Sequence, residues 1–113
     1  MSGRVPSVDV TEARKLLDDG AVLLDVRRDD EWHAGHAPHA HHIPLDQLVA
    51  RAGEVPPDQQ VVAVCRTGAR SGQATRFLRG SGIDVVNLDG GMQAWARAGG
   101  DVVRDGGAHG HVA

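Results

Sequence analysis

Apolar residues in this 113-residue chain gather into short runs rather than into strictly alternating patterns. The three clearest runs are AVLLDV (21–26), QVVAVC (60–65) and DVVNLD (84–89). Apolar runs of this length are typical of strands buried on both faces, as in a parallel sheet. HHIP (41–44) predicts one further short strand.

Helical patterns separate these runs. Thr11 is a candidate N-cap for a helix that stops at Gly20. Further helical segments are predicted at 29–35, 45–53, 71–82 and 91–99, the last with Met92 and Trp95 packed inward. Strands alternating with helices over this length indicate a single α/β domain with a parallel sheet. We place it at residues 8–103, between a flexible N-terminus (1–7) and a flexible, weakly apolar C-terminal tail (104–113).

Charge and composition exclude several classes of function. A formal net charge of -3 argues against general nucleic-acid binding, because phosphate neutralisation requires a basic face. No segment has the length and apolar character of a signal peptide or a membrane span, so we expect a cytoplasmic protein without a membrane partner. The single cysteine cannot form an internal disulfide, which also fits a reducing compartment.

That cysteine, Cys65, ends a predicted buried strand and is followed by the small-residue segment RTGAR. In open α/β sheets, ligands bind at the carboxyl ends of the strands. A tight loop there, with Gly68 free to adopt a positive φ, aims several backbone N–H groups at one point. The following helix adds its positive end, and Arg66 and Arg70 add charge, so we expect an acidified, nucleophilic thiol. A small buried core residue is the alternative interpretation of a lone cysteine.

The spacing of the loop distinguishes between substrates. Phosphatase-type cysteine loops have the pattern C-x5-R, in which the ring of N–H groups encircles a phosphoryl group. Here Arg70 stands one position early and Ser71 occupies the sixth position. The shorter loop favours a smaller group than phosphate.

Three stretches in order resemble the rhodanese family of single-domain sulfurtransferases. They are LLDVRRDDEWHAGHAPHAHHIPL (23–45), the loop VVAVCRTGARS (61–71) and NLDGGMQAW (87–95). The resemblance implies a single rhodanese-like domain, with a mostly parallel central sheet flanked by helices on both faces. It also implies an enzyme without a cofactor.

The family's chemistry implies roles for individual residues. Cys65 would accept a sulfane sulfur from an anionic donor such as thiosulfate and pass it from the persulfide to cyanide, a thiol or a protein acceptor. This two-step reaction is ping-pong. The amides of the loop would cradle the persulfide, and Arg66 and Arg70 would form a cationic rim. The resulting substrate-binding set is Arg66, Thr67, Gly68, Ala69, Arg70 and Ser71.

Four further matched residues are expected to be structural and close to the site. Asp25 is expected to cap a turn or hold an arginine. Arg27 and Glu31 stand four apart, a spacing that permits a helical salt bridge. His36 matches the family pattern and is expected to be structural.

The departure from the family pattern is a segment with five histidines in ten residues: His33, His36, His39, His41 and His42. Such a cluster raises the question of metal binding. The spacing is irregular, and no carboxylate or second thiol is clearly paired with it, so we predict surface histidines and no metal.

Two other functions compete with sulfur transfer. One is a non-catalytic regulatory or interaction module on the same fold. The other, less favoured because of the short loop, is a phosphatase or arsenate reductase. The sulfurtransferase hypothesis requires loop N–H groups directed at the sulfur and a thiol that substrates can reach.

Overall fold

The computed structural model describes residues 4–113 and forms one five-stranded sheet of order β1-β5-β4-β2-β3, with every neighbouring pair parallel. The strands are β1 (Ser7–Val8), β2 (Val22–Asp25), β3 (His41–His42), β4 (Val61–Val64) and β5 (Val85–Leu88). The three apolar runs are confirmed as β2, β4 and β5, and β3 lies within the predicted strand at 41–44. The pattern missed β1, because two residues leave no periodicity to detect.

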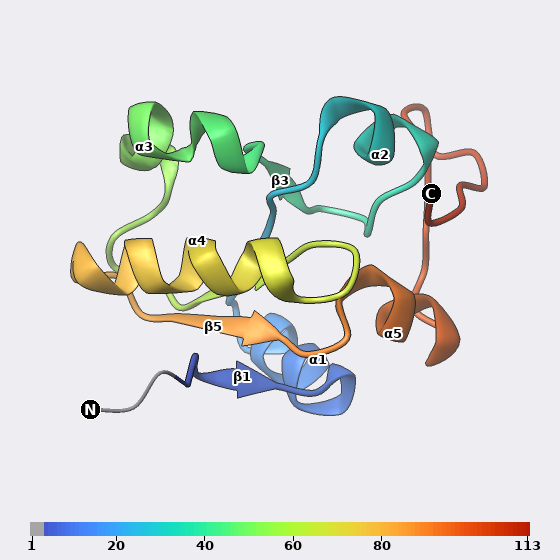
Figure 1. Ribbon diagram of the computed structural model, residues 1–113. Helices are drawn as coiled ribbons and strands as arrows, with labels where there is room; N and C mark the ends of the chain where they lie inside the picture. The colour runs from blue at the N-terminus through green and yellow to red at the C-terminus, as the bar shows by residue number, and fades with distance from the viewer. Residues whose placement is uncertain (1–3) are drawn as a thin grey trace.

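Helices cover both faces of the sheet, as Figure 1 shows. The α-helices are α1 (Val10–Asp18), α2 (Asp29–Ala34), α3 (Leu48–Arg51), α4 (Ala69–Gly80) and α5 (Gly91–Arg97). One buried cluster joins the sheet to α3 and α4, and the other joins it to α1 and α5. Neighbouring strand residues such as Leu23 and Leu24 enter opposite clusters, which confirms the two-layered burial expected of a parallel sheet. No helix within residues 4–113 has the length and apolar character needed to cross a membrane.

Several helix boundaries differ from the predictions. Helix α1 is capped by Asp9, whose carboxylate accepts the Glu12 N–H, and not by Thr11, which lies inside the helix. Helix α4 begins at Ala69, two residues before the predicted start. The segment 45–53 divides into 3-10 turns at Leu45–Gln47 and Ala52–Glu54 on either side of the short α3.

The strand order places the end of β4 at a change in winding direction. The chain moves from β2 to β3 on one side, then crosses back over β2 to form β4 on the other. Asp25 at the end of β2 is in register with Val64 at the end of β4, so the residues that follow both strands meet at one edge. Such a crevice is where open parallel sheets bind ligands.

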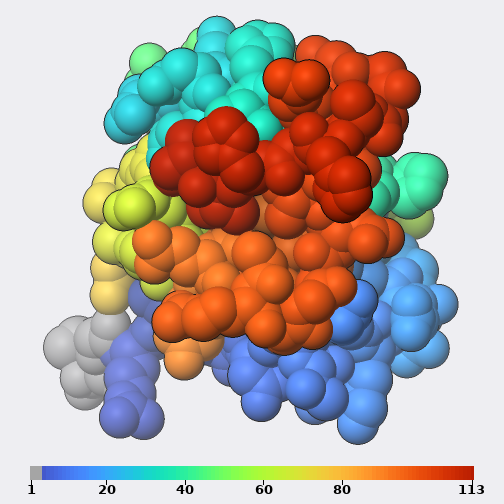
Figure 2. Space-filling model, turned by 90° about the vertical axis from the view of Figure 1, so that its right-hand side faces the viewer, coloured from blue at the N-terminus to red at the C-terminus, as the bar shows by residue number. Residues whose placement is uncertain are grey.

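The C-terminal residues, for which the sequence predicts a flexible tail at 104–113, lie against the domain in this structure. Val103 forms antiparallel bridges with His36 and His109, and the His111 N–H donates to the Ala34 carbonyl. Figure 2 shows this segment in red between the cyan residues around α2 and the orange residues near α5. Most of these contacts are backbone hydrogen bonds, which an apolar pattern does not reveal. Of the predicted flexible N-terminus, residues 1–3 lie outside the described residues and Ser7 belongs to β1.

Candidate active site

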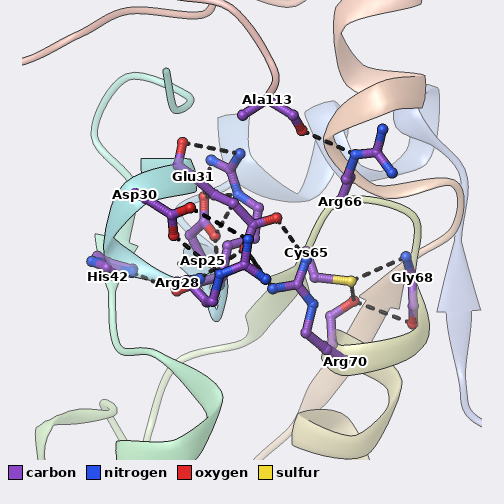
Figure 3. Close-up of polar contacts among 12 residues, drawn as sticks. Asp25, Arg28, Asp30, Glu31, His42, Cys65, Arg66, Gly68, Arg70 and Ala113 are labelled. Atoms are coloured by element: carbon purple, nitrogen blue, oxygen red, sulfur yellow. Dashed lines mark hydrogen bonds and ion pairs between the residues drawn. The ribbon is translucent and has the colours of Figure 1, made fainter. Parts of the chain in front are cut away.

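The loop after β4 wraps around the sulfur of Cys65. The Gly68 N–H donates to Cys65 Sγ at 3.1 Å (Figure 3). The Ser71 Oγ lies 3.3 Å from the same atom. Gly68 has φ 120°, a left-handed conformation that favours glycine, and directly precedes α4. The predicted tight turn is therefore present, and the N-terminus of α4 points at the thiol.

The first turn of α5 holds the other side of this loop. The N–H groups of Met92 and Gln93 donate to the carbonyls of Cys65 and Arg66, at 2.8 and 3.1 Å. Because the C=O and N–H of one peptide point in opposite directions, carbonyls directed at α5 turn the following N–H groups of the loop away from it. Gly91 makes this approach possible, since a Cβ there would lie 2.5 Å from the Cys65 carbonyl oxygen.

Opposing influences act on the Cys65 thiol. Burial, the largest of them, raises its pKa. Hydrogen bonds to the sulfur lower it and bring the pKa below the ordinary value; the largest is that of the Ser71 hydroxyl whenever its hydrogen is directed at Sγ, and the others come from the backbone N–H groups of Ser71, Gly68 and Thr67. The loop thus favours a thiolate despite its apolar surroundings.

Cys65 is buried, with 1% of its surface exposed, which differs from the accessible thiol that the hypothesis requires. A cavity of about 460 Å³ lies beside the loop and is lined by Arg28, Asp30, Glu31, Arg66, Arg70 and Ala113. Cys65 itself does not line it. The sulfur is therefore not part of the wall of this cavity.

The two loop arginines already have partners in this structure. The Arg70 guanidinium binds the Glu31 carboxylate through two hydrogen bonds, of 2.6 and 2.8 Å. The Arg66 Nε–H donates to the Ala113 main-chain oxygen at 2.9 Å. Both side chains line the cavity, and there the charge of Arg70 is neutralised by Glu31.

The paired arginine also determines the charge of Glu31. The hydrogen bonds from Arg70 are the largest influence and lower the pKa of Glu31 from 4.5 to about 2, against the opposing effect of burial. The Arg28 backbone N–H adds a further hydrogen bond to the same carboxylate. Glu31 is therefore ionised over the whole physiological range.

The expected salt bridge between Arg27 and Glu31 is wrong. Arg27 binds Asp25 instead, with Nη2 to Oδ2 at 2.7 Å and the Arg27 backbone N–H to Oδ1 at 3.0 Å. Arg27 precedes α2, which begins at Asp29, so the helical spacing does not apply to it. The expectation that Asp25 caps a turn or holds an arginine is met in both respects, and Arg27 also reaches the carbonyl of Gly35.

The histidines of 33–42 do not form one group. The His36 ring stacks on the Trp32 ring at 3.6 Å between centroids, and the His42 ring stacks at 4.6 Å. His36 Nδ1 also contacts the Trp32 carbonyl, consistent with a structural role. Within residues 4–113, no three side chains among His, Cys, Asp and Glu gather closely enough to hold a metal ion.

The structure brings the predicted loop residues together around Cys65, and Glu31 joins them through Arg70. Asp25, Arg27 and His36 support the adjacent turn and do not contact the sulfur. One further residue at the site, Asn87, was not predicted from the sequence; it is a buried side chain of β5 that contacts both Gly68 and Ser71. The available signal was a polar residue inside the apolar run VVNL.

Comparison with known proteins agrees with this geometry. The family model described as "Rhodanese-like domain" matches residues 9–98. A protein of Allochromatium vinosum named "Sulfurtransferase" is 43% identical over 89 residues, covering 77% of this chain and 83% of that protein. The "Putative sulfurtransferase YtwF" of Bacillus subtilis is 36% identical over 78 residues, covering 69% of this chain and 76% of its own.

Solved structures of rhodanese-related proteins and sulfurtransferases also superpose on this chain. The human single-domain sulfurtransferase TSTD1 superposes with a TM-score of 0.74 at 30% identity, covering 83% of this chain and 97% of that one. A rhodanese-related protein of Thermoplasma volcanium superposes with a TM-score of 0.82 at 28% identity, covering 87% and 97%. These relatives support a sulfurtransferase function of the rhodanese type. By its family model, its relatives and its fold, the chain belongs to the rhodanese-like domain family.

Proposed function

We propose that the protein is a sulfurtransferase that carries sulfane sulfur as a persulfide of Cys65. The observation that supports it is the loop of N–H donors around a single thiol, with Gly68 N–H 3.1 Å from the sulfur. Preorganised donors of this kind stabilise negative charge, first on the thiolate and then on the terminal sulfur of the persulfide.

The first half-reaction takes sulfur from an anionic donor, for which thiosulfate is the simplest example. The Cys65 thiolate attacks the outer sulfur of thiosulfate, the S–S bond of the donor breaks, and sulfite leaves with the electron pair. In the second half-reaction, cyanide or a thiolate attacks the outer sulfur and the electron pair returns to Cys65. Neither half-reaction requires a cofactor.

Entry of the donor requires a change at the rim of the cavity. Since Arg70 is held by Glu31 and Arg66 by the Ala113 oxygen, the anion gains a cation by displacing one of these partners. Movement of the same side chains opens the way to the buried sulfur. The donor thus replaces contacts that the two loop arginines make in this structure.

The burial of Cys65 favours a second candidate, a non-catalytic interaction module of the same family. In that case the thiol is a core residue and the cavity beside it serves a partner rather than a sulfur donor. The two candidates differ in whether the folded protein takes up sulfur.

Intact mass after incubation with thiosulfate separates them. The wild type is expected to gain the mass of one sulfur atom and to lose it again on addition of cyanide. The Cys65→Ser variant gains none, and because the chain has one cysteine the site of the adduct is unambiguous. No adduct with thiosulfate or with a neutral organic trisulfide would overturn the proposal and favour the interaction module.

A further inference from the structure

The Ser71 hydroxyl faces three acceptors but carries one hydrogen. The Cys65 Sγ lies 3.3 Å from Ser71 Oγ, the Gly68 carbonyl oxygen 3.4 Å, and the Asn87 Oδ1 2.5 Å. The shortest contact is the one with Asn87. At that separation a hydrogen must lie between the two oxygens.

The orientation of the Asn87 amide is fixed by its other neighbour. Asn87 Nδ2 lies 3.2 Å from the Gly68 carbonyl oxygen, which can only accept a hydrogen bond. The NH₂ group must therefore face Gly68, which leaves the amide oxygen facing Ser71. An amide oxygen only accepts, so Ser71 is the donor in that pair and its hydrogen does not point at the sulfur.

This arrangement gives the thiol and the thiolate different partners. A protonated Cys65 can donate its hydrogen to a free lone pair of Ser71 Oγ. At the same time the Ser71 hydroxyl donates its own hydrogen to the Asn87 amide oxygen. A thiolate needs the Ser71 hydrogen, and taking it leaves the buried Asn87 oxygen without a donor. The pair thus opposes negative charge on the inner sulfur, although the backbone N–H groups favour it.

We propose that Asn87 is a positioning residue that withholds the Ser71 hydrogen from Cys65 and so favours the persulfide, in which the inner sulfur is neutral. In the persulfide the charge lies on the outer sulfur, one bond further from Ser71, and the hydrogen can stay with Asn87. The kinetic consequence of this inference rests on the proposed sulfur transfer. The hydrogen-bond competition itself does not.

The same competition for the Ser71 hydrogen affects the rate at which the persulfide gives up its outer sulfur. When cyanide attacks, its carbon bonds to the outer sulfur, the S–S bond breaks and the electron pair moves to Cys65 Sγ. That leaving group is a thiolate, and a thiolate of lower pKa leaves faster. Asn87 therefore slows discharge and lengthens the lifetime of the loaded protein.

Asn87→Val tests this with little disturbance to the fold. Valine suits a buried parallel strand, and the Gly68 carbonyl keeps the Gly72 N–H as a donor at 3.0 Å. The charged groups near the thiol are unchanged in the variant. They are Arg66 on the loop, Arg70 on α4 with its partner Glu31 on α2, and the ion pair of Asp25 and Arg27 after β2.

The measurement is the ultraviolet absorbance of the Cys65 thiolate as a function of pH. With one cysteine and no tyrosine in the chain, no other thiolate or phenolate contributes. We expect Asn87→Val to lower the pKa of Cys65 by about one unit, a tenfold change in ionisation, because the freed Ser71 hydrogen turns to the sulfur. In a Ser71→Ala background the same change should have no effect on that pKa.

If Asn87 only supported the loop, the Asn87→Val substitution would shift the pKa of Cys65 in the opposite direction. Loosening the loop would withdraw N–H groups and raise the pKa, so an unchanged or raised value in Asn87→Val overturns the inference. So does an equal decrease in the Ser71→Ala background. Asn87→Ala provides a second variant should Asn87→Val fail to fold.

Single-turnover discharge of preloaded protein to cyanide supplies the kinetic readout. A leaving-group pKa one unit lower is expected to speed discharge about threefold in Asn87→Val. An unchanged or slower rate contradicts the kinetic part of the inference. If the wild type never takes up sulfur, the proposed function fails while the result on the pKa still decides the role of Asn87.

Discussion

Two arginine–carboxylate pairs lie near the carboxyl ends of β2 and β4, and they differ in how deeply they are buried. Arg27 and Asp25 are both fully buried, and Arg27 also binds the Gly35 carbonyl. Arg70 and Glu31 stand on the wall of a cavity, with side chains 29% and 5% exposed. A ligand cannot reach the first pair, because both side chains are fully buried. The second pair lines a cavity that a ligand can enter.

The difference shows why burial decides what an arginine can do. Removing the partner of a buried charge leaves it with neither water nor a counter-ion, so the Arg27–Asp25 pair is fixed. Arg70 can exchange Glu31 for another anion, since both water and ligand reach it from the cavity. Arg27 thus belongs to the scaffold, and Arg70 is the side chain suited to respond to a substrate.

The largest expected effect comes from breaking the buried pair. Arg27→Ala leaves Asp25 charged and buried, and we expect the free energy of unfolding to fall by about 3–5 kcal/mol. Urea denaturation followed by circular dichroism measures it. Arg28→Ala, at an exposed neighbouring position, is the matched control and should leave the midpoint unchanged. A loss as small as that of the control would mean that the buried pair is not structural.

The pair on the cavity wall is expected to contribute less and to depend on pH. The pKa of Glu31 is lowered from 4.5 to about 2, so its stabilisation is full above about pH 4.5 and is lost as the pH falls toward about 2. Glu31→Gln should cost about 2 kcal/mol at neutral pH, after allowing for solvent around Arg70. Urea denaturation at several pH values measures this, and the difference between variant and wild type should shrink below pH 4.5. A difference independent of pH would mean that the charge of Glu31 is not the cause.

Substrate use separates the pairs further. Arg70→Ala is expected to lower kcat/KM for thiosulfate about tenfold, equivalent to about 1.4 kcal/mol, and to affect a neutral trisulfide less. Glu31→Gln should act in the opposite direction on thiosulfate, because it frees the guanidinium for the donor. Steady-state assays with both donors measure these effects. Equal losses with the two donors would mean that Arg70 only supports the loop.

The sequence predicted the parts of the fold that depend on apolar content. The runs that became β2, β4 and β5 are continuous and buried, and they place Cys65 at the carboxyl end of a strand, where it directly follows β4, without any knowledge of the other strands. The two-residue β1 was missed because it leaves no periodicity to detect and its partner, β5, lies eighty residues away in the sequence. The contacts of residues 104–113 were missed because the backbone makes most of them.

The sequence predicted which residues form the candidate site but not which of them pair with one another. Cys65, Gly68 and Arg70 come from one local segment, so their proximity follows from the turn itself. The assignment of Arg27 to Glu31 failed because spacing along a helix says nothing of a residue that precedes it. The pairing of Arg70 with Glu31 could be found only in the three-dimensional structure, because the two residues are 39 positions apart in the sequence.

An exposed ion pair completes the comparison and gives the smallest expected effect. Arg28 and Asp30 lie on the same cavity wall at 3.1 Å, but their side chains are 69% and 71% exposed. Solvent and salt screen such a pair, so Asp30→Asn should leave the unfolding midpoint unchanged and alter kcat/KM for thiosulfate by less than about twofold. Both are measured beside the Glu31→Gln variant under identical conditions, since the two carboxylates line one cavity and differ mainly in burial. If Asp30→Asn matched Glu31→Gln in either measurement, proximity to the cavity rather than burial of the carboxylate would determine how strongly an ion pair acts at this site.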